Sequence, residues 1–205
     1  MSFKPMAVII LLLIFSVPLT IGVLSNNLPS LLHSQQAIAQ KTATTMSSFL
    51  TYHNSTYGIN IQYPSDWLYK GSEISNDSVQ SIVTFASPTL FTSSSNKSIP
   101  VVSVGIEKLS FYNVPLDLYT NLTINHLRKS ELGFSLLGSS DVSFAGIKPA
   151  HKIVFTSDSG RKTMAVYAIK GDKAYIIDYI AGSDSTYSNY GLIAQKMIDS
   201  FQILK

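Results

Sequence analysis

Two adjacent stretches rich in β-branched and aromatic residues, 162–169 and 173–181, flank the dipeptide Gly171-Asp172. A two-residue connection of this kind between two such stretches is typical of a tight β-hairpin. The pattern therefore predicts an antiparallel strand pair. An antiparallel pair close to the end of the chain excludes a fold made only of parallel β-α-β units.

The remaining strand and helix signals extend this sheet. Tyr57 to Tyr63 alternates apolar and polar residues with a period of two, as a half-buried strand does. Further strands are expected at 79–86, 99–109, 135–137 with 141–144, and 151–156. Apolar residues at three- and four-residue steps predict amphipathic helices over 115–131 and 187–201. One helix midway and one at the end, among consecutive strands, indicate an α+β fold with a central antiparallel sheet.

Prolines and a glycine mark the ends of several elements. Pro64 has no N–H for a strand ladder, so the first strand should stop there and turn, delivering Trp67 into the core. Pro115 suits the first residue of the mid-chain helix, where a missing N–H costs nothing. Gly133 is the candidate C-cap of the same helix.

The first 39 residues have the order of a secretory leader. Lys4 precedes an apolar run from Ala7 to Leu24, and Ala37-Ile38-Ala39 resembles a small-x-small cleavage site. The eighteen residues of this run span about 27 Å as a helix, so an uncleaved signal anchor is the alternative to a cleaved signal peptide. Both interpretations send the body out of the cytoplasm, secreted or anchored to the membrane. Residues 40–48 then form a linker, and 49–205 form one domain.

Composition excludes several classes of partner and chemistry. Removing the leader leaves 14 Lys and Arg (15 less Lys4) against 12 Asp and Glu, a formal charge of +2. So small an excess does not point to a nucleic-acid partner, and membrane contact is expected only through residues 7–24 if the leader stays uncleaved. The chain has no cysteine, which excludes disulfides, thiolate zinc sites and thiol nucleophiles.

No catalytic or metal motif stands out. The mature histidines lie before the first predicted strand (His53), on the mid-chain helix (His126) and at the start of a strand (His151), without metal-ligand spacing. Ser139 follows a glycine but lacks the second glycine of a nucleophile elbow, and we expect it in a loop. Asp178 lies inside an apolar strand, so burial of its face would require a hydrogen-bond partner or a raised pKa. We therefore expect no enzyme, no cofactor and no bound metal.

Aromatic residues are the remaining signal for a binding surface. Side chains from both ends of the domain would line a ligand or partner groove if the first strand meets the last helix. Core packing is the other reading of these residues. Together with Asp178, the candidate set is Tyr63, Trp67, Tyr69, Tyr187 and Tyr190.

Four sequons make glycosylation a hypothesis for an exported protein. Their asparagines are Asn54, Asn76, Asn96 and Asn121.

Three ordered stretches resemble the PsbP-like family, named after an extrinsic subunit of the photosystem II oxygen-evolving complex. They are 57–67 (YGINIQYPSDW), 149–153 (PAHKI) followed by 171–175 (GDKAY), and 197–201 (MIDSF). The resemblance implies a central antiparallel sheet with helices on both faces, an α/β/α sandwich, over residues 49–205. It also implies a non-enzymatic accessory module that binds a partner protein, in some members assisting metal supply. Residues 25–48 show no counterpart of the docking segment of photosynthetic members.

These observations lead to one functional expectation and two alternatives. The first is a non-catalytic extracytoplasmic binding or accessory domain that acts on another extracytoplasmic or membrane protein. The first alternative is a carrier of a small ligand or a metal ion in the aromatic groove. The second is a hydrolase whose site the sequence does not reveal.

Overall fold

A computed structural model describes residues 48–71, 79–88 and 100–204, all of which belong to one compact unit. The predicted leader, the linker up to residue 47, Asn76 and Asn96 lie outside the described residues. None of the described helices is both long and apolar enough to cross a bilayer.

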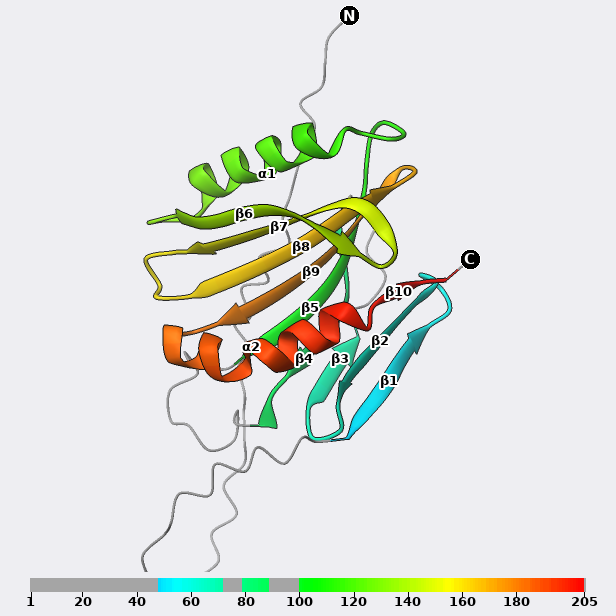
Figure 1. Cartoon of the computed structure of the whole chain (residues 1–205), viewed down its shortest axis with the longest axis vertical. Coiled ribbons are helices and arrows are strands. Elements are labelled where there is room, and N and C mark those ends of the chain that lie inside the picture. The colour runs from blue at the N-terminus through cyan, green and yellow to red at the C-terminus, as the bar shows by residue number, and fades with distance from the viewer. Residues whose placement is uncertain (1–47, 72–78, 89–99, 205) are drawn as a thin grey trace, which may run out of the picture. The chain divides into compact units, whose positions relative to one another are not determined.

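The described chain forms ten strands and two helices (Figure 1). The strands of the first half are β1 (Phe49–Asn54), β2 (Ile59–Pro64), β3 (Leu68–Gly71), β4 (Val79–Ala86) and β5 (Val101–Lys108). The second half contributes α1 (Leu116–Ser130), β6 (Ser135–Phe144), β7 (Ile147–Thr156), β8 (Lys162–Lys170), β9 (Lys173–Ala181), α2 (Asp184–Asp199) and β10 (Gln202–Ile203).

The strands divide between two antiparallel sheets. Seven of them form the larger sheet in the order β3-β4-β5-β9-β8-β7-β6, and β1-β2-β10 form a smaller one. In Figure 1 the smaller sheet lies at the lower right, beside β3 and the C-terminal end of α2. The prediction of an α+β fold with a central antiparallel sheet is confirmed, whereas the second, smaller sheet was not predicted. The first predicted strand, now β2, pairs with β1 and β10 and not with the larger sheet.

The two helices contact different faces of the larger sheet. On β9, Ile177 and Tyr179 join the core cluster that holds Ala194 and Met197 of α2. On β8, Tyr167 pairs with Ile176 of β9 and therefore points to the face opposite Ile177. Its hydroxyl donates to Thr120 of α1 at 3.0 Å. Because successive strand residues point to opposite faces, α2 and α1 pack against opposite sides. We call these sides the α2 face and the α1 face.

Local chemistry explains where the helices begin. Ser183 caps α2 because its hydroxyl accepts a hydrogen bond from the Thr186 N–H at 3.2 Å. The helix therefore begins three residues before the predicted start at 187 and ends at Asp199. Pro115 occupies the N-cap position of α1, one residue before the first helical residue Leu116. Glu131 is the C-cap of α1, in place of the predicted Gly133.

Several strand predictions are confirmed within a residue or two, and others need correction. β4 and β9 match the predicted ranges, and Lys170 pairs with Lys173 across the Gly171-Asp172 turn. Strands β1 and β3 were not predicted. Segments 135–137 and 141–144 are parts of one strand, β6, interrupted by two register shifts. Ser139 therefore lies in a strand and not in the predicted loop.

Candidate functional site

An aromatic cluster fills the junction between the two sheets. Tyr69 of β3 contacts Tyr52 of β1 and Tyr63 of β2, with ring centroids 5.3 Å and 5.5 Å away. Phe85 of β4 completes the group, 4.9 Å from Tyr63. We call these four residues the seam cluster, because they join the edge strand of the larger sheet to the smaller sheet.

The seam cluster is buried on one side and open on the other. Tyr63 is only 8% exposed and Phe85 is fully buried, whereas Tyr69 is 53% exposed and Leu50 of β1 is 47% exposed. β3 and β1 are edge strands among the described elements, and all four residues of β3 are exposed. The seam therefore combines exposed apolar side chains with strand edges that lack a neighbour in the described sheets.

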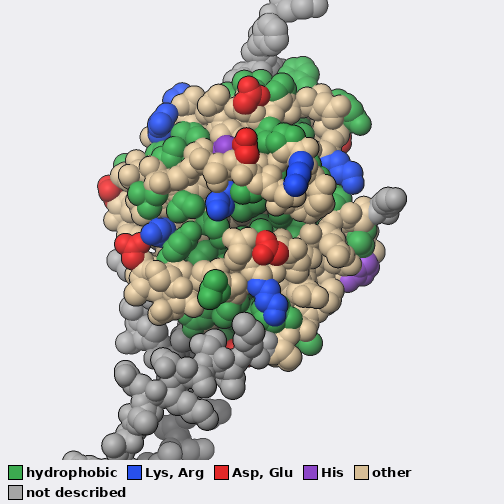
Figure 2. Space-filling view, viewed as in Figure 1, with side chains coloured by type: hydrophobic (Ala, Val, Ile, Leu, Met, Phe, Trp, Pro, Cys, Tyr) green, Lys and Arg blue, Asp and Glu red, His purple; other side chains and the backbone are tan. Residues whose placement is uncertain are grey.

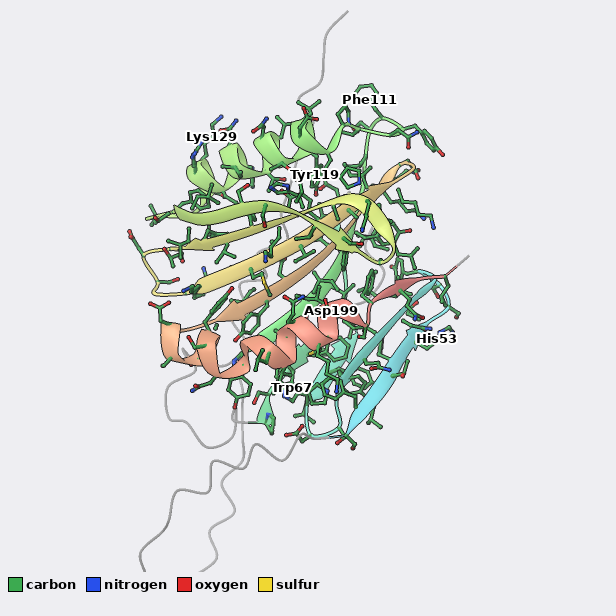
Figure 3. The ribbon with its side chains drawn as sticks, in the orientation of Figure 1. His53, Trp67, Phe111, Tyr119, Lys129 and Asp199 are labelled. Atoms are coloured by element: carbon green, nitrogen blue, oxygen red, sulfur yellow. The ribbon has the colours of Figure 1, made fainter. Side chains whose placement is uncertain are left out.

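A second aromatic group lies under α2. Trp67 is 4% exposed and its ring lies 6.1 Å from that of Tyr190 (Figure 3 labels Trp67 below α2). Tyr187 packs 5.1 Å from Tyr179, whose hydroxyl donates to the Thr186 and Tyr187 carbonyls. The first strands and the last helix do meet, as the groove hypothesis requires. Trp67 and Tyr63, however, are core residues and cannot line an open groove.

Asp178 is separated from these aromatic residues because it lies on the α1 face. Its cross-strand neighbour is Ser103, whose hydroxyl lies 3.1 Å from that of Thr84. All three side chains are buried, and Asp178 Oδ1 has no hydrogen-bond partner in the described structure. Burial raises the pKa of Asp178 to about 7, because an ionised carboxylate is costly away from water. The sequence predicted a hydrogen-bond partner or a raised pKa for Asp178 if this face were buried, and the face is buried.

The α1 face contains a second buried acid, Glu107. Tyr119 of α1 donates its hydroxyl to Glu107 Oε2 at 2.7 Å, and both residues are almost fully buried. Burial and the nearby Glu107 raise the pKa of Tyr119 well above its ordinary value, so it remains a donor. Tyr167 lies 5.3 Å from Tyr119, ring to ring, and burial raises its pKa to about 12.

Strand pairing assembles a Ser-His-Asp arrangement that sequence reasoning missed. His151 Nε2 lies 2.8 Å from Ser139 Oγ, and His151 Nδ1 lies 2.8 Å from Asp141 Oδ1. These distances match those of a catalytic triad. The Asp141 side chain is 80% exposed, however, whereas a triad acid is buried where water cannot compete for the imidazole. Asp141 and His151 are direct cross-strand partners, so ordinary pairing on a hairpin accounts for the contact.

The other histidines do not converge with His151. His53 of β1 bonds Asn60 of β2 at 2.6 Å, and His126 lies on α1. No cluster of three metal-ligating side chains occurs among residues 48–71, 79–88 and 100–204. Within that part of the chain, the arrangement offers no assembled metal centre.

A cavity of about 510 Å³ lies between the β6–β7 turn and the C-terminal end of α2. Phe144 and Phe201 stack at its base with centroids 5.2 Å apart and planes 7° from parallel. Ala145, Gly146, Asp199 and Ile203 are among its other lining residues. None of the predicted groove residues lines this cavity.

Two of the four predicted glycosylation sites can be placed. Asn54 donates to the Tyr52 hydroxyl and accepts from the Tyr57 N–H, so its side chain is engaged in a turn. Asn121 is exposed on α1, although Thr123 of the same sequon is fully buried. Glycosylation of these residues stays a prediction.

Solved structures with this fold have low sequence identity to the chain. Cyanobacterial PsbP from Synechocystis sp. is 14% identical, with a TM-score of 0.54, over 81% of this chain and 98% of that one. LpqN of Mycobacterium tuberculosis, described as involved in cell envelope biogenesis, is 15% identical, with a TM-score of 0.54, over 77% and 91%. PA94 of Pseudomonas aeruginosa, a putative regulator of unknown function, is 12% identical, with a TM-score of 0.51, over 74% and 94%.

At these identities the structural matches establish the fold alone. No curated protein matches the chain. The family comparison is more specific, because the sequence matches the PsbP-like protein family over residues 6–203, nearly its whole length. The three stretches that suggested this resemblance all lie within the match. The chain belongs to the PsbP-like protein family.

Proposed function

We propose that this protein is a non-catalytic accessory domain that works outside the cytoplasm and binds a partner protein through the seam cluster. The observation that carries the proposal is the exposure of Tyr69 and Leu50 over a buried aromatic base, between two edge strands. The buried side chains of Tyr63 and Phe85 stabilise the fold. The exposed side chains of Tyr69 and Leu50 are available for contact with another molecule.

The chemistry of the seam suits a protein partner. Tyrosine offers a large apolar surface and a hydroxyl at little entropic cost, and it is enriched where interfaces concentrate their binding energy. The edges of β3 and β1 present backbone donors and acceptors to which an extended segment can add as a strand. The Tyr69 ring already contacts three other rings, so less side-chain entropy is lost on binding than for a fully free side chain.

The extracytoplasmic location rests on the leader-like order of residues 1–39. LpqN, which shares the fold and is described as involved in cell envelope biogenesis, agrees with this location. Protease added to intact cells tests the location: an exported domain is digested, whereas a cytoplasmic one is protected until the cells are lysed.

Site-specific photocrosslinking tests the partner surface. A benzophenone amino acid replaces Tyr69 in the full chain, which is expressed in its native host and irradiated. We expect a discrete crosslinked protein that is absent without light. A second chain carries the same amino acid in place of Leu192, which is 86% exposed on α2 and serves as the matched control.

Crosslinks of equal pattern and yield from positions 69 and 192 would show that the seam is not a specific surface. If position 69 gives no crosslink at any expression level, the seam is not the docking site. Either result removes the observation on which the proposal depends.

A second candidate is a small-ligand carrier, and the cavity beside α2 is the observation that favours it. Its volume of about 510 Å³ falls in the range of small-molecule sites, and aromatic and backbone groups line it together. Calorimetry of the protein against divalent cations and small-metabolite mixtures separates the candidates. If no heat of binding is measured with the cations, the protein is not a metal-ion carrier. Phe144→Trp narrows the cavity and should abolish any heat of binding measured with a metabolite.

A further inference from the structure

The loop between β5 and α1 exposes two consecutive aromatic residues at one end of the molecule. Phe111 is 61% exposed and Tyr112 is 73% exposed. Figure 3 shows Phe111 on this loop at the upper right, far from the seam cluster. Neither residue contributes to the hydrophobic core cluster.

This loop is fixed to the neighbouring β8–β9 turn. The Leu109 N–H donates to the Asp172 carbonyl at 2.7 Å, and the Asn113 N–H donates to the Gly171 carbonyl at 2.8 Å. Leu109 and Val114 are both buried and anchor the two ends of the loop. The fold therefore holds Phe111 and Tyr112 outward in a defined loop, and we call residues 109–114 the apical loop.

Glycine at position 171 allows the contact between the loop and the turn. Gly171 has φ +67°, and a Cβ there would lie 3.2 Å from the Tyr112 ring. The Tyr112 ring therefore lies close to the turn, while most of its side chain is exposed.

Three lysines lie in one row next to the apical loop. Lys108 of β5 is the register partner of Lys173 of β9, and Lys173 is the partner of Lys170 of β8. All three are exposed, and Asp172 is the acidic residue of the turn between them. Like charges placed directly opposite each other on neighbouring strands destabilise a sheet. Folding alone therefore does not account for this row.

We propose that the apical loop and the lysine row dock on an anionic lipid surface. The lysines complement the negative charge of lipid headgroups, and each lysine near the surface should strengthen binding about fivefold. Phe and Tyr suit the interface between headgroups and acyl chains, where an aromatic ring has apolar surroundings and a hydroxyl stays hydrated. Figure 2 shows apolar and basic side chains side by side at the upper right of the molecule.

The shape of the site favours lipid over a protein partner. Protein interfaces concentrate binding energy in packed central pockets, whereas Phe111 and Tyr112 project from a loop and form no pocket. A fluid headgroup layer accommodates a projecting tip without matching its shape. The proposal depends on the proposed function in one respect, since an exported body behind an apolar leader meets a lipid surface. It adds a membrane contact beyond residues 7–24.

A tryptophan at position 111 reports directly on lipid insertion. The chain contains one tryptophan, Trp67, which is 4% exposed and gives a background that the wild-type spectrum removes. The full chain carrying Phe111→Trp is reconstituted with vesicles of phosphatidylglycerol and phosphatidylcholine that carry bromine-labelled acyl chains. We expect a blue-shifted emission that the bromines quench.

Leu132→Trp is the matched control. Leu132 is 82% exposed and follows α1, whose 15 residues place it about 22 Å from the apical loop. Its emission should stay that of a water-exposed tryptophan, although both variants carry the same leader. Equal quenching at positions 111 and 132, or no quenching at 111, would overturn the proposal.

The lysine row is tested in the same assay. Lys108, Lys170 and Lys173 are each replaced by glutamine in turn. Each replacement should weaken the binding of the apical loop to the vesicles about fivefold. Raising the salt from about 0.1 M to about 1 M shortens the Debye length from about 10 Å to about 3 Å and should have a similar effect. Quenching that is equal in pure phosphatidylcholine would overturn the anionic requirement.

A protein partner at the tip would give a different result. An emission shift with native membranes that disappears after protease treatment, with none in pure lipid vesicles, would assign the tip to a protein and overturn the lipid proposal. The seam test remains independent, because Tyr69 and Phe111 lie on separate surfaces and each can fail alone.

Discussion

The two faces of the larger sheet differ in what they bury. The α2 face packs apolar and aromatic side chains, among them Ile177, Tyr179 and Met197, against one another. The α1 face buries acids and hydroxyl groups, including Asp178, Glu107 and Thr123, and two of these have an atom without a partner in the described structure. The difference indicates that the α1 face, unlike the α2 face, makes stability depend on protonation and hydrogen bonding.

The largest expected effect comes from the α2 face. Trp67→Ala should lower the free energy of unfolding by about 3–5 kcal/mol, because it removes a buried indole and leaves a cavity. Urea denaturation followed by circular dichroism measures the change. Leu68→Ala is the control, since the adjacent Leu68 is 52% exposed and should cost little. A loss below about 1 kcal/mol for Trp67→Ala would mean that Trp67 lines a groove and not the core.

On the α1 face, Asp178 should make stability fall as pH rises. Its folded pKa is about 7 and its ordinary value is 3.8. Below pH 4 the carboxyl is protonated in both states; between 4 and 7 the unfolded chain ionises while the folded chain resists. Stability is therefore lost over this window, by at most about 4 kcal/mol, and the loss levels off above pH 7.

Asp178→Asn should remove that pH dependence and stabilise the protein at pH 8. Urea denaturation at a series of pH values measures it, with the exposed Asp66→Asn as the control. If the slope between pH 4 and 7 is the same in wild type and Asp178→Asn, the carboxyl is not buried as described. The contrast between the two faces would then lose its main support.

A smaller effect is expected from the hydrogen bond between α1 and Glu107. Tyr119→Phe removes a 2.7 Å bond to a buried carboxyl group and should cost about 2 kcal/mol. Tyr112→Phe, at a side chain that is 73% exposed, should cost less than about 0.5 kcal/mol. The same denaturation assay compares the two. Equal costs would indicate that water reaches Glu107 and that the α1 face is not sealed.

The smallest effect is expected at Ser139. Ser139→Ala should change stability by less than about 0.5 kcal/mol, because the side chain is exposed. A fluorophosphonate probe should leave the wild-type protein unlabelled, since Asp141 is too exposed to hold His151 as a base. Labelling of Ser139 that is lost in His151→Ala would contradict this and support the hydrolase alternative.

The sequence predicted the elements whose side chains are patterned by burial. The bounds of β9 were predicted correctly, because buried apolar residues run along the strand and the Gly171-Asp172 turn comes directly before it. β3 was missed because Leu68, Tyr69, Lys70 and Gly71 are all exposed, so no burial period marks the strand. β6 was divided at the point where its register shifts between Leu136 and Gly138, because the shift interrupts the alternation of apolar and polar residues.

Long-range pairing explains the other misses. The split into two sheets depends on β10 pairing with β2, whose residues lie about 140 positions earlier, and no local pattern encodes a pairing partner. The contacts of His151 with Ser139 and with Asp141 likewise arise from the register of the hairpin. For the predicted groove, the sequence identified the aromatic residues and correctly placed Trp67 in the core, but it did not show that Tyr63 is buried or that Asp178 lies on the α1 face.

Hydrogen exchange tests the proposed docking surface most directly. The full chain is compared in native membranes and in detergent after removal of bound proteins, and exchange is followed strand by strand. The account predicts slower exchange of amides in β1 and β3 in native membranes, with β6, the opposite edge of the larger sheet, unchanged. Unchanged exchange in β1 and β3, or protection confined to β6, would contradict docking at the seam.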